Sequence, residues 1–422
     1  MRSELSRALG CALGVSLVVV SQRAEAADGD ACANLSDENN SIPAIYIENG
    51  DTQEPVVKKI GKLLMQSSTK LRVFYRNRPT CNIRSDLFSN AVMTTVVDGA
   101  TPRPVRYIPS SATFDPSGPA PTCTVPAAGD PSAVPIALGI GATYLSSCAP
   151  TPAQPNDIGV FEGPVQAYGF ITNKNSSQVA ITAEEGYLAY GFTEGGGEAA
   201  PWTVQNLRFK RGNTASTTLT MSSAIRLLPT QMQAAADSGT SEGLITSVMN
   251  ATTPEAALGI LGTELFDQRR ADIKLLAFKT FGQKFAYFPD STNATFDKQN
   301  VRDGHYLPWS PTPYIAKVTP GTKTITDANA KRIYELVMGT RVGDDVDGLL
   351  QVVQSGLVPE CAMKVTRSGD GADLSLYDDP APCGCYFEKN VPQGSTTCKQ
   401  CTVGNDGPCN GGKCRFGFCE AK

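Results

Sequence analysis

The sequence predicts an α/β protein with two or more lobes or domains and a small disulfide-rich module at its C-terminus. Strand and helix patterns alternate along most of the chain, which favours mostly parallel sheets covered by helices. The 422 residues are too many for one core of ordinary size. Seven cysteines crowd between Cys383 and Cys419 among few apolar residues, a pattern typical of a small unit held by disulfides.

The strands are predicted from short apolar or β-branched runs that end at turn residues. The first is Pro43–Ile47, and the turn Asn49–Gln53 follows it. Further strands are predicted at Leu71–Tyr75, Pro135–Ile140, Val165–Thr172, Val204–Lys210, Ile273–Phe278 and Tyr314–Val318. Helix patterns and loops separate these runs, as a layered α/β fold requires.

The helices are predicted from apolar residues three or four positions apart and from signals at their ends. One runs from Val56 to Leu64, with Pro55 in its first turn. A capping box at Thr182–Glu185 opens another, which ends at Gly191. Two more are predicted from Thr253-Pro254 to near Gly262 and across Ala330–Val337.

The stretch Leu207–Pro229 is predicted to complete a strand, pass through a basic polar loop and begin a helix. Met221, Ile225 and Leu228 would share one face of that helix, and Pro229 would end it. This stretch is central because a helix start that faces a cleft offers unpaired backbone N–H groups.

Hydroxyl side chains crowd the start of this helix. Thr214, Ser216 and Thr217 follow the cations Lys210 and Arg211. Because a helix N-terminus carries unpaired N–H groups and a positive dipole end, the arrangement suits an anion. Ordinary helix capping by Ser or Thr explains the same residues equally well.

The overall charge restricts the classes of partner. The formal net charge of −4 gives no general attraction to nucleic acid or to an acidic membrane surface. No nucleic-acid partner is therefore predicted, and an anion site would have to be local.

Residues 1–26 have the layout of a secretory signal peptide. Two arginines precede the apolar run Ala12–Val20, and the small residues Ala24 and Ala26, on either side of Glu25, favour cleavage before Ala27. The apolar run is too short to span a membrane. The sequence therefore predicts a periplasmic or secreted protein.

Twelve cysteines remain after the signal peptide, and an even number in an exported chain indicates disulfides. Their spacing predicts two bonds in the N-terminal region and four in the C-terminal region, without fixing the pairs. Zinc at Cys398-x-x-Cys401 is the alternative, which an oxidising compartment disfavours. The N-terminal set is Cys32, Cys81, Cys123 and Cys148, and the C-terminal set is Cys361, Cys383, Cys385, Cys398, Cys401, Cys409, Cys414 and Cys419.

Several segments, taken in order, resemble the phosphate-type substrate-binding proteins of ABC transporters, which have the type 2 periplasmic-binding-protein fold. The segment Asn300–Tyr306 is similar to the return segment of that family. The other matching segments are Ile45–Thr52, Asp157–Asn173, Ile181–Gly186, Pro201-Trp202 and Arg211–Thr217.

The resemblance implies two α/β lobes that close over a small anion. Two crossover segments would join the lobes, near Pro164–Thr172 and Val301–Tyr314. The implied parts are lobe 1 at 27–163 with a return segment at 303–360, lobe 2 at 164–302, and a Cys-rich C-terminal module at 361–422.

The resemblance also implies a set of ligand contacts. Arg211 and Thr217 keep the spacing of the family's binding loop, with Thr214 and Ser216 in place of two glycines. Thr52 lies in the other binding loop, beside Asp51, whose charge does not suit an anion. The implied contacts are Thr52, Arg211, Thr214, Ser216 and Thr217.

One element of the family's site is missing. The family supplies a hydroxyl and a carboxylate at a strand end that corresponds to Ala137–Ala142, where this chain has neither. That carboxylate accepts a proton from a protonated oxyanion, in a charged hydrogen bond worth about 1.5–3 kcal/mol. We therefore expect weaker discrimination for a protonated anion.

Enzyme motifs are weak. Ser67-x-x-Lys70 has no partner motif, and a base would have to be His305, the single histidine. Trp202 is predicted as a packing anchor. The acidic cluster Asp344, Asp345 and Asp347 is predicted to cap the helix through Leu350, and calcium, the alternative, lacks the loop spacing of a known motif. No enzymatic activity, cofactor or metal is predicted.

Two functions therefore remain open, with a secreted hydrolase as a third. The first is an exported solute-binding protein that captures phosphate or a related oxyanion, with an ABC permease as a candidate partner. The alternative is a secreted interaction or adhesion protein that has lost transport and uses its Cys-rich tail to contact a surface or a protein.

Overall fold

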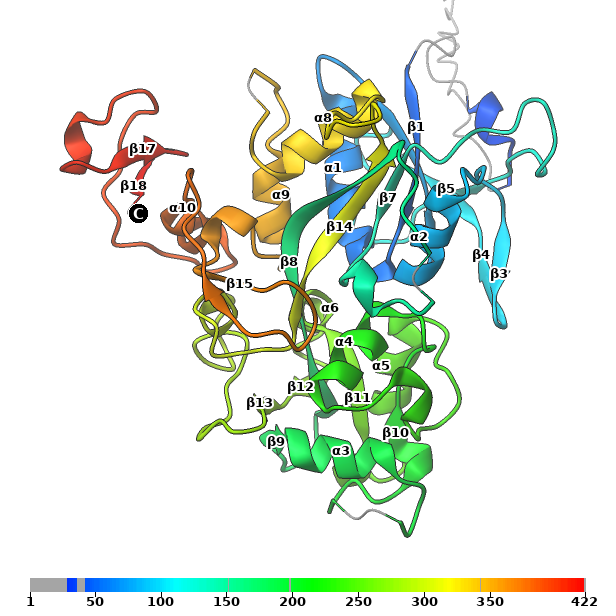
Figure 1. Cartoon of the computed structure of the whole chain (residues 1–422), viewed down its shortest axis with the longest axis vertical. Helices are drawn as coiled ribbons and strands as arrows, with labels where there is room; N and C mark the ends of the chain where they lie inside the picture. The colour runs from blue at the N-terminus through cyan, green and yellow to red at the C-terminus, as the bar shows by residue number, and fades with distance from the viewer. Residues whose placement is uncertain (1–28, 36–41, 151, 197–198, 342, 421–422) are drawn as a thin grey trace, which may run out of the picture.

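A computed structural model describes residues 29–35, 42–150, 152–196, 199–341 and 343–420. Two lobes lie one above the other along the long axis of the molecule, and the C-terminal segment lies beside the upper lobe (Figure 1). The predicted signal peptide lies outside the described residues. Within those residues, no helix combines the length and the apolar character needed to cross a membrane.

Lobe 1, the upper lobe in Figure 1, is built on a parallel sheet. Strand β1 (Ala44–Asn49) pairs in parallel with β2 (Arg72–Asn77) on one side and β7 (Leu138–Ile140) on the other. Ile60 and Leu64 on the first helix are buried, which is the apolar face that the sequence predicted. The helices of this lobe are α1 (Glu54–Gln66), α2 (Thr80–Phe88), α8 (Ala328–Val337) and α9 (Gly348–Gln354).

Four short strands extend lobe 1 at one edge. Strand β5 (Val105–Tyr107) pairs antiparallel with β2, and β6 (Thr122–Cys123) pairs with β5. Strands β3 (Val96–Asp98) and β4 (Thr101–Arg103) form a separate hairpin. The Arg103 side chain donates to the Gly239 carbonyl of lobe 2 at 3.4 Å, so the hairpin contacts both lobes.

Two strands cross between the lobes. Strand β8 (Ile158–Asn173) leaves lobe 1 and β14 (Trp309–Lys317) returns to it, antiparallel to β8 and to β7. The far half of β8 pairs with the lobe 2 strands β11 (Leu258–Gly262) and β12 (Ile273–Leu275). The predicted α/β fold with two lobes and two crossovers is therefore confirmed. The exact lobe boundaries stay a prediction, because both crossover strands belong to both lobes.

Lobe 2 surrounds the far half of β8 with short strands and helices. Trp202 is buried in its core, as predicted. The capping box at Thr182 and Glu185 is present, and α3 ends at Gly191. The remaining elements are β9 (Ala180–Thr182), α3 (Ala183–Gly191), β10 (Arg208–Phe209), α4 (Ser216–Ala224), α5 (Ser241–Met249), α6 (Thr263–Gln268), β13 (Ala277–Lys279) and α7 (Gln299–Arg302).

The helix predicted from Thr253 to near Gly262 is wrong. A single 3-10 turn, Pro254–Ala256, is followed by strand β11, whose five residues are all buried. A short apolar run buried on both faces lacks alternation, so its pattern does not separate strand from helix. Leu258–Gly262 forms a strand because it pairs with a neighbouring strand on each side.

Three further boundaries differ from the predictions. Helix α4 ends at Ala224 because Arg226 takes a left-handed backbone conformation at φ 58°, and Leu228 is 62% exposed instead of sharing the buried face. The strand predicted at Val204–Lys210 shrinks to Arg208–Phe209 after a 3-10 turn. The strand predicted at Ile273–Phe278 is split into β12 and β13.

All twelve described cysteines form disulfides, divided between the two regions as predicted. The bonds are Cys32–Cys123, Cys81–Cys148, Cys361–Cys383, Cys385–Cys398, Cys401–Cys414 and Cys409–Cys419. Cys398 and Cys401 therefore belong to different bonds, which leaves neither thiolate for zinc. The C-terminal elements are β15 (Val365–Thr366), β16 (Ser375–Leu376), α10 (Gly384–Asn390), β17 (Lys413–Arg415) and β18 (Phe418–Glu420).

Candidate anion site between the lobes

The predicted ligand residues lie on two loops, one from each lobe. Thr52, in the 3-10 turn Asp51–Gln53 after β1, is 1% exposed, and Arg211, before α4, is 3% exposed. Ser216 and Thr217 are buried in the first turn of α4, whereas Thr214 is exposed. Four of the five side chains are therefore buried, and Thr214 lies on the outer part of its loop.

The hydroxyl groups at the start of α4 do not cap the helix. Its N-cap is Ala215, without a side-chain hydrogen bond. The Ser216 hydroxyl bonds to that of Tyr168 on β8, and Thr218 donates to the Arg211 carbonyl at 2.9 Å. Within the described part of the chain, the hydroxyls of Thr52 and Thr217 have no hydrogen-bond partner.

Arg211 contacts lobe 1 directly. Its Nη1 donates to Asp51 Oδ2 at 2.5 Å and to Ser241 Oγ at 2.9 Å. The same Asp51 oxygen accepts from Ser241 Oγ at 3.0 Å and from the Ser241 backbone N–H at 3.2 Å. Ser241 is the first residue of α5, so one carboxylate oxygen receives a guanidinium, a hydroxyl and a helix N-terminal amide.

The surroundings of Asp51 favour its charged form. Burial by itself would raise the pKa of Asp51, but the guanidinium groups of Arg211 and Arg103 and the hydrogen bonds from Ser241 lower it below its ordinary value. Asp51 is therefore a carboxylate anion from lobe 1, held by a set of donors from lobe 2.

Ser241 was not among the sequence-predicted residues. A signal for it exists in Thr240-Ser241-Glu242 ahead of the apolar Leu244, Ile245 and Val248, because this is the composition of a capped helix start. That signal locates a helix N-terminus, but it does not show which loop of the other lobe faces it.

Ala142, just beyond the strand end where the family has its hydroxyl and carboxylate, is bonded within the protein. Strand β7 ends at Ile140, and the Tyr168 hydroxyl donates to the Ala142 carbonyl just beyond it. The Ala142 backbone N–H donates to Thr80 Oγ1 at 3.0 Å. Both backbone groups of Ala142 are therefore used within the protein.

A second polar connection crosses the interface beside β8. Gln53 of lobe 1 donates to the side-chain oxygen of Gln166, whose Nε2 donates to Glu264 Oε2 of lobe 2 at 2.9 Å. A Cβ atom on Gly262 would lie 2.4 Å from both Glu264 oxygens, so only glycine leaves room for this carboxyl group. Burial raises the pKa of Glu264 well above its ordinary value, which favours the neutral acid.

Glu264→Gln is expected to make unfolding less dependent on pH. Above the ordinary pKa of 4.5 the unfolded chain releases this proton while the folded protein keeps it, so wild-type stability falls as the pH rises toward the folded pKa. Each unit of difference is worth about 1.4 kcal/mol. The variant should gain relative stability from pH 4.5 upward in urea unfolding, whereas Glu194→Gln, in an exposed turn, should follow wild type. Parallel curves for wild type and Glu264→Gln would contradict this.

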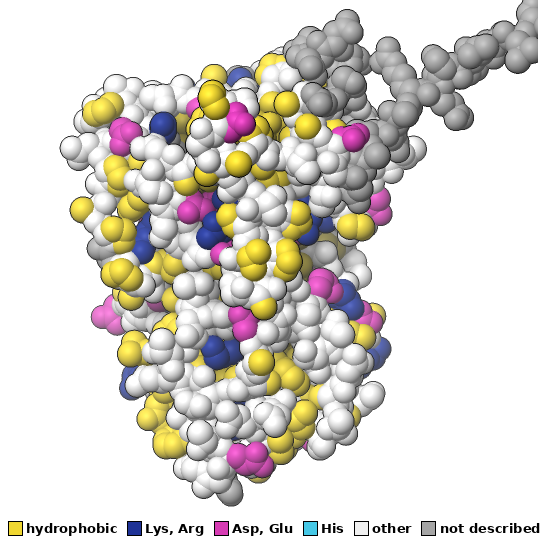
Figure 2. Space-filling model, turned by 90° about the vertical axis from the view of Figure 1, so that its right-hand side faces the viewer, with side chains coloured by type: hydrophobic (Ala, Val, Ile, Leu, Met, Phe, Trp, Pro, Cys, Tyr) yellow, Lys and Arg dark blue, Asp and Glu magenta, His cyan; other side chains and the backbone are white. Residues whose placement is uncertain are grey.

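Three cavities of similar volume lie away from the Asp51–Arg211 contact, one of them, of about 350 Å³, beside residues 154–161 and 318–323. Another of about 360 Å³ lies between residues 294–299 and α10, and one of about 340 Å³ lies beside the end of α4 and residues 370–374. The molecule narrows between its upper and lower lobes, and acidic and basic side chains are interspersed over the face in view (Figure 2). At the candidate site the lobes are joined by the Asp51–Arg211 ion pair, 2.5 Å long.

Three residues that the sequence analysis did not assign to a site, Ser67, His305 and Asp347, make local contacts in the structure. Beyond the end of α1, Ser67 Oγ lies 2.9 Å from the Leu64 carbonyl oxygen and 2.7 Å from that of Thr69, either of which can accept its single proton. His305 is exposed and bonds to Asp303 at 2.8 Å. Asp347 caps α9 by accepting from the Leu350 N–H at 2.9 Å. These contacts give Ser67 and His305 no arrangement for acyl transfer.

Comparison with known proteins gives distant similarities in structure. A candidate phosphate ABC transporter substrate-binding protein with bound phosphate from Clostridium perfringens is 12% identical, with 75% of this chain and 99% of that chain covered and a TM-score of 0.47. A candidate phosphate-binding protein from Planctomyces limnophilus is 12% identical, with 76% and 94% covered and a TM-score of 0.40. The CcmR regulatory domain of Synechocystis, in complex with 2-PG, is 8% identical, with 71% and 98% covered and a TM-score of 0.39.

No family model matches the sequence, and no curated protein matches it. At these identities and TM-scores, the ligands and activities of those proteins are not assigned to this chain. The two-lobed fold follows from the strand order of this chain and from its two crossover strands.

Proposed function

We propose that this protein is an exported binding protein that captures a small oxyanion, phosphate or a relative of it, between its two lobes. An ABC permease would be the partner that receives the solute. The observation that carries the proposal is the group of donors around Arg211, in which a guanidinium, a hydroxyl and a helix N-terminal amide converge on one oxygen atom.

The chemistry of this group suits an oxyanion. A hydrogen bond to a charged acceptor contributes about 1.5–3 kcal/mol, and a helix N-terminus adds favourable charge. The buried hydroxyls of Thr52 and Thr217 have no partner among the described residues, so they are two further donors for a bound solute. Ser216 and Thr214 complete the proposed contacts on the α4 loop.

The test is calorimetry of the mature protein with phosphate, arsenate, sulfate and chloride. We expect a tetrahedral oxyanion to bind, and Arg211→Met to weaken it by about tenfold to a hundredfold, because a charged hydrogen-bond donor is lost. Arg226→Met is the matched control, since that exposed guanidinium stacks on Phe281 at 4.3 Å. Silence with all four anions, or equal affinity in Arg211→Met, would reject the proposal.

A second function is favoured by the Asp51 contact, because a site already filled by a side chain has less need of a solute. In that case the protein would be a secreted interaction protein that uses its Cys-rich module, where Leu376 is 91% exposed and Val403 68%. Native mass spectrometry of the purified mature protein separates the two functions, since a co-purified small anion supports capture.

A further inference from the structure

The carboxylate of Asp51 fills the donor group that the proposed function assigns to a solute. Asp51 comes from the short turn after β1 in lobe 1, whereas Arg211 and Ser241 belong to lobe 2. Three hydrogen bonds from two lobe 2 residues end on one oxygen of this carboxylate. The contact therefore joins the two lobes and also occupies the hydrogen-bond donors of the site.

We propose that Asp51 is a resident anion: it holds the two lobes together without solute, and an oxyanion enters by displacing it. Only the second statement, displacement by an oxyanion, rests on the proposed function. The first statement, closure on an internal carboxylate, concerns the protein alone.

The positions of the charges make displacement feasible. The Asp51 side chain is 19% exposed, whereas that of Arg211 is 4% exposed, so the carboxylate is the accessible member of the pair. Arg103, on the β3–β4 hairpin of lobe 1, also attracts Asp51 electrostatically. A carboxylate that leaves Arg211 therefore keeps a cation nearby in its own lobe.

Displacement also predicts which solutes compete. An entering anion has to replace a carboxylate that already receives three donors, so a weakly charged or poorly accepting anion gains nothing by exchange. A tetrahedral oxyanion has further acceptor oxygen atoms, and Thr52 and Thr217, on the same two loops, have hydroxyls without a partner among the described residues. Those additional acceptors distinguish it from the planar carboxylate that it replaces.

Asp51→Asn tests both statements, because it keeps the shape of the side chain and removes its charge. Without solute, small-angle scattering should show a larger radius of gyration than for wild type, and phosphate should restore the compact form. Calorimetry should show phosphate binding about tenfold tighter or more, since Arg211 is no longer neutralised. Asp115→Asn, which removes an exposed carboxylate bonded to Ser117, is the control and should match wild type.

The outcomes separate this inference from the proposed function. If Asp51→Asn opens the lobes but no oxyanion binds either protein, the resident anion stands and solute capture fails. If wild type binds phosphate and Asp51→Asn binds it no tighter, displacement is overturned while capture stands. If Asp51→Asn stays as compact as wild type without solute, while thermal unfolding shows it folded, the inference is overturned.

Discussion

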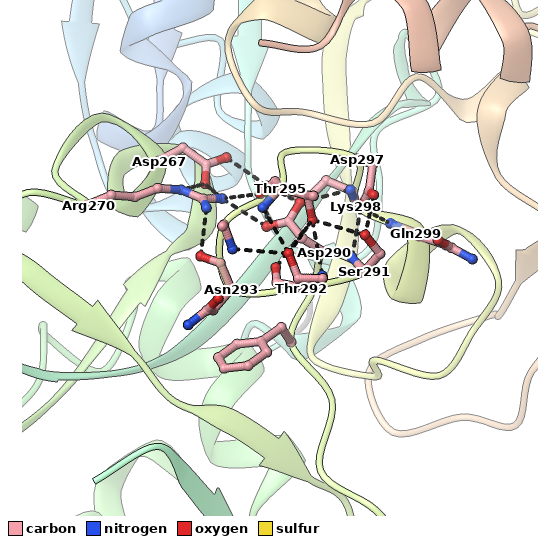
Figure 3. Close-up of polar contacts among 12 residues, drawn as sticks. Asp267, Arg270, Asp290, Ser291, Thr292, Asn293, Thr295, Asp297, Lys298 and Gln299 are labelled. Carbon is pink, nitrogen blue, oxygen red and sulfur yellow. Dashed lines mark hydrogen bonds and ion pairs between the residues drawn. The ribbon is translucent and has the colours of Figure 1, made fainter. Parts of the chain in front are cut away.

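Replacing Lys298 with methionine is expected to lower the free energy of unfolding by about 3–5 kcal/mol, because it removes one partner from a buried ion-pair network. The Lys298 side chain is 1% exposed, and its Nζ lies 2.7 Å from Asp267 Oδ2 and 3.0 Å from Asp290 Oδ1. Arg270 joins the same two carboxylates, at 2.6 Å and 3.0 Å (Figure 3). Two buried acids and two cations therefore balance one another.

The cost of the substitution comes from the charge left behind. Burial by itself raises the pKa of Asp290, and the Lys298 ammonium opposes that rise. Without the ammonium, Arg270 alone would face two carboxylates in a poorly solvated site. The Lys298 backbone N–H bonds to Asp290 Oδ1 at 2.8 Å and survives the change, so the loss reports the side-chain charge.

Denaturant unfolding of the mature protein measures this effect. Lys284→Met is the matched control, since Lys284 is exposed and a surface substitution changes stability by about 0.5 kcal/mol or less. Adding Asp290→Asn to Lys298→Met should recover part of the loss, because it removes the uncompensated charge. A Lys298→Met protein within about 1 kcal/mol of wild type would contradict the argument of a buried ion pair.

Local sequence patterns were sufficient where one element determines its own form. The first strand, the helix after Pro55 and the capping box at Thr182 each follow from residues within one or two turns. Strand β11 shows the limit, because Leu258–Gly262 is apolar throughout and only its neighbours β8 and β10 make it a strand. The fold class was therefore predictable while several boundaries were not.

The candidate site shows the same limit more sharply. Arg211 was predicted from the residues around it, and its loop does lead into a helix start. Its partner Asp51 is 160 residues away in the sequence, where the local pattern marks it only as a charge unsuited to an anion. Pairing between loops of different lobes depends on how β8 and β14 place those lobes, and no local pattern records that.

The segment Val365–Leu376 makes a second set of polar contacts, separate from that of Asp51. This segment lies across the region where β8 and β14 pass between the lobes (Figure 1). Asp370 Oδ2 accepts from Ser147 Oγ at 2.6 Å and from Thr143 Oγ1 at 3.1 Å. Since the Thr143 proton goes to Asp370, the Thr220 hydroxyl of lobe 2, 2.8 Å away, donates to Thr143. Residues 365–376 are thus bonded to lobe 1, and Thr143 in turn is bonded to Thr220 of lobe 2.

Asp370→Ala is therefore expected to destabilise the protein by about 2–4 kcal/mol, since two hydroxyls lose a charged acceptor in a buried position. Burial raises the pKa of Asp370, because desolvation disfavours its charged form. That desolvation offsets part of the stability that the carboxylate contributes. Asp370→Asn should therefore lower the free energy of unfolding by less than Asp370→Ala. The rate of backbone hydrogen exchange should rise at residues 143–147 and at residues 365–376 together, because the hydrogen bonds of Asp370 join these two segments. Asp373→Ala, exposed on the same segment, should change neither. Faster exchange at residues 365–376 alone would contradict this, because it would show that the Asp370 bonds do not stabilise residues 143–147 of lobe 1.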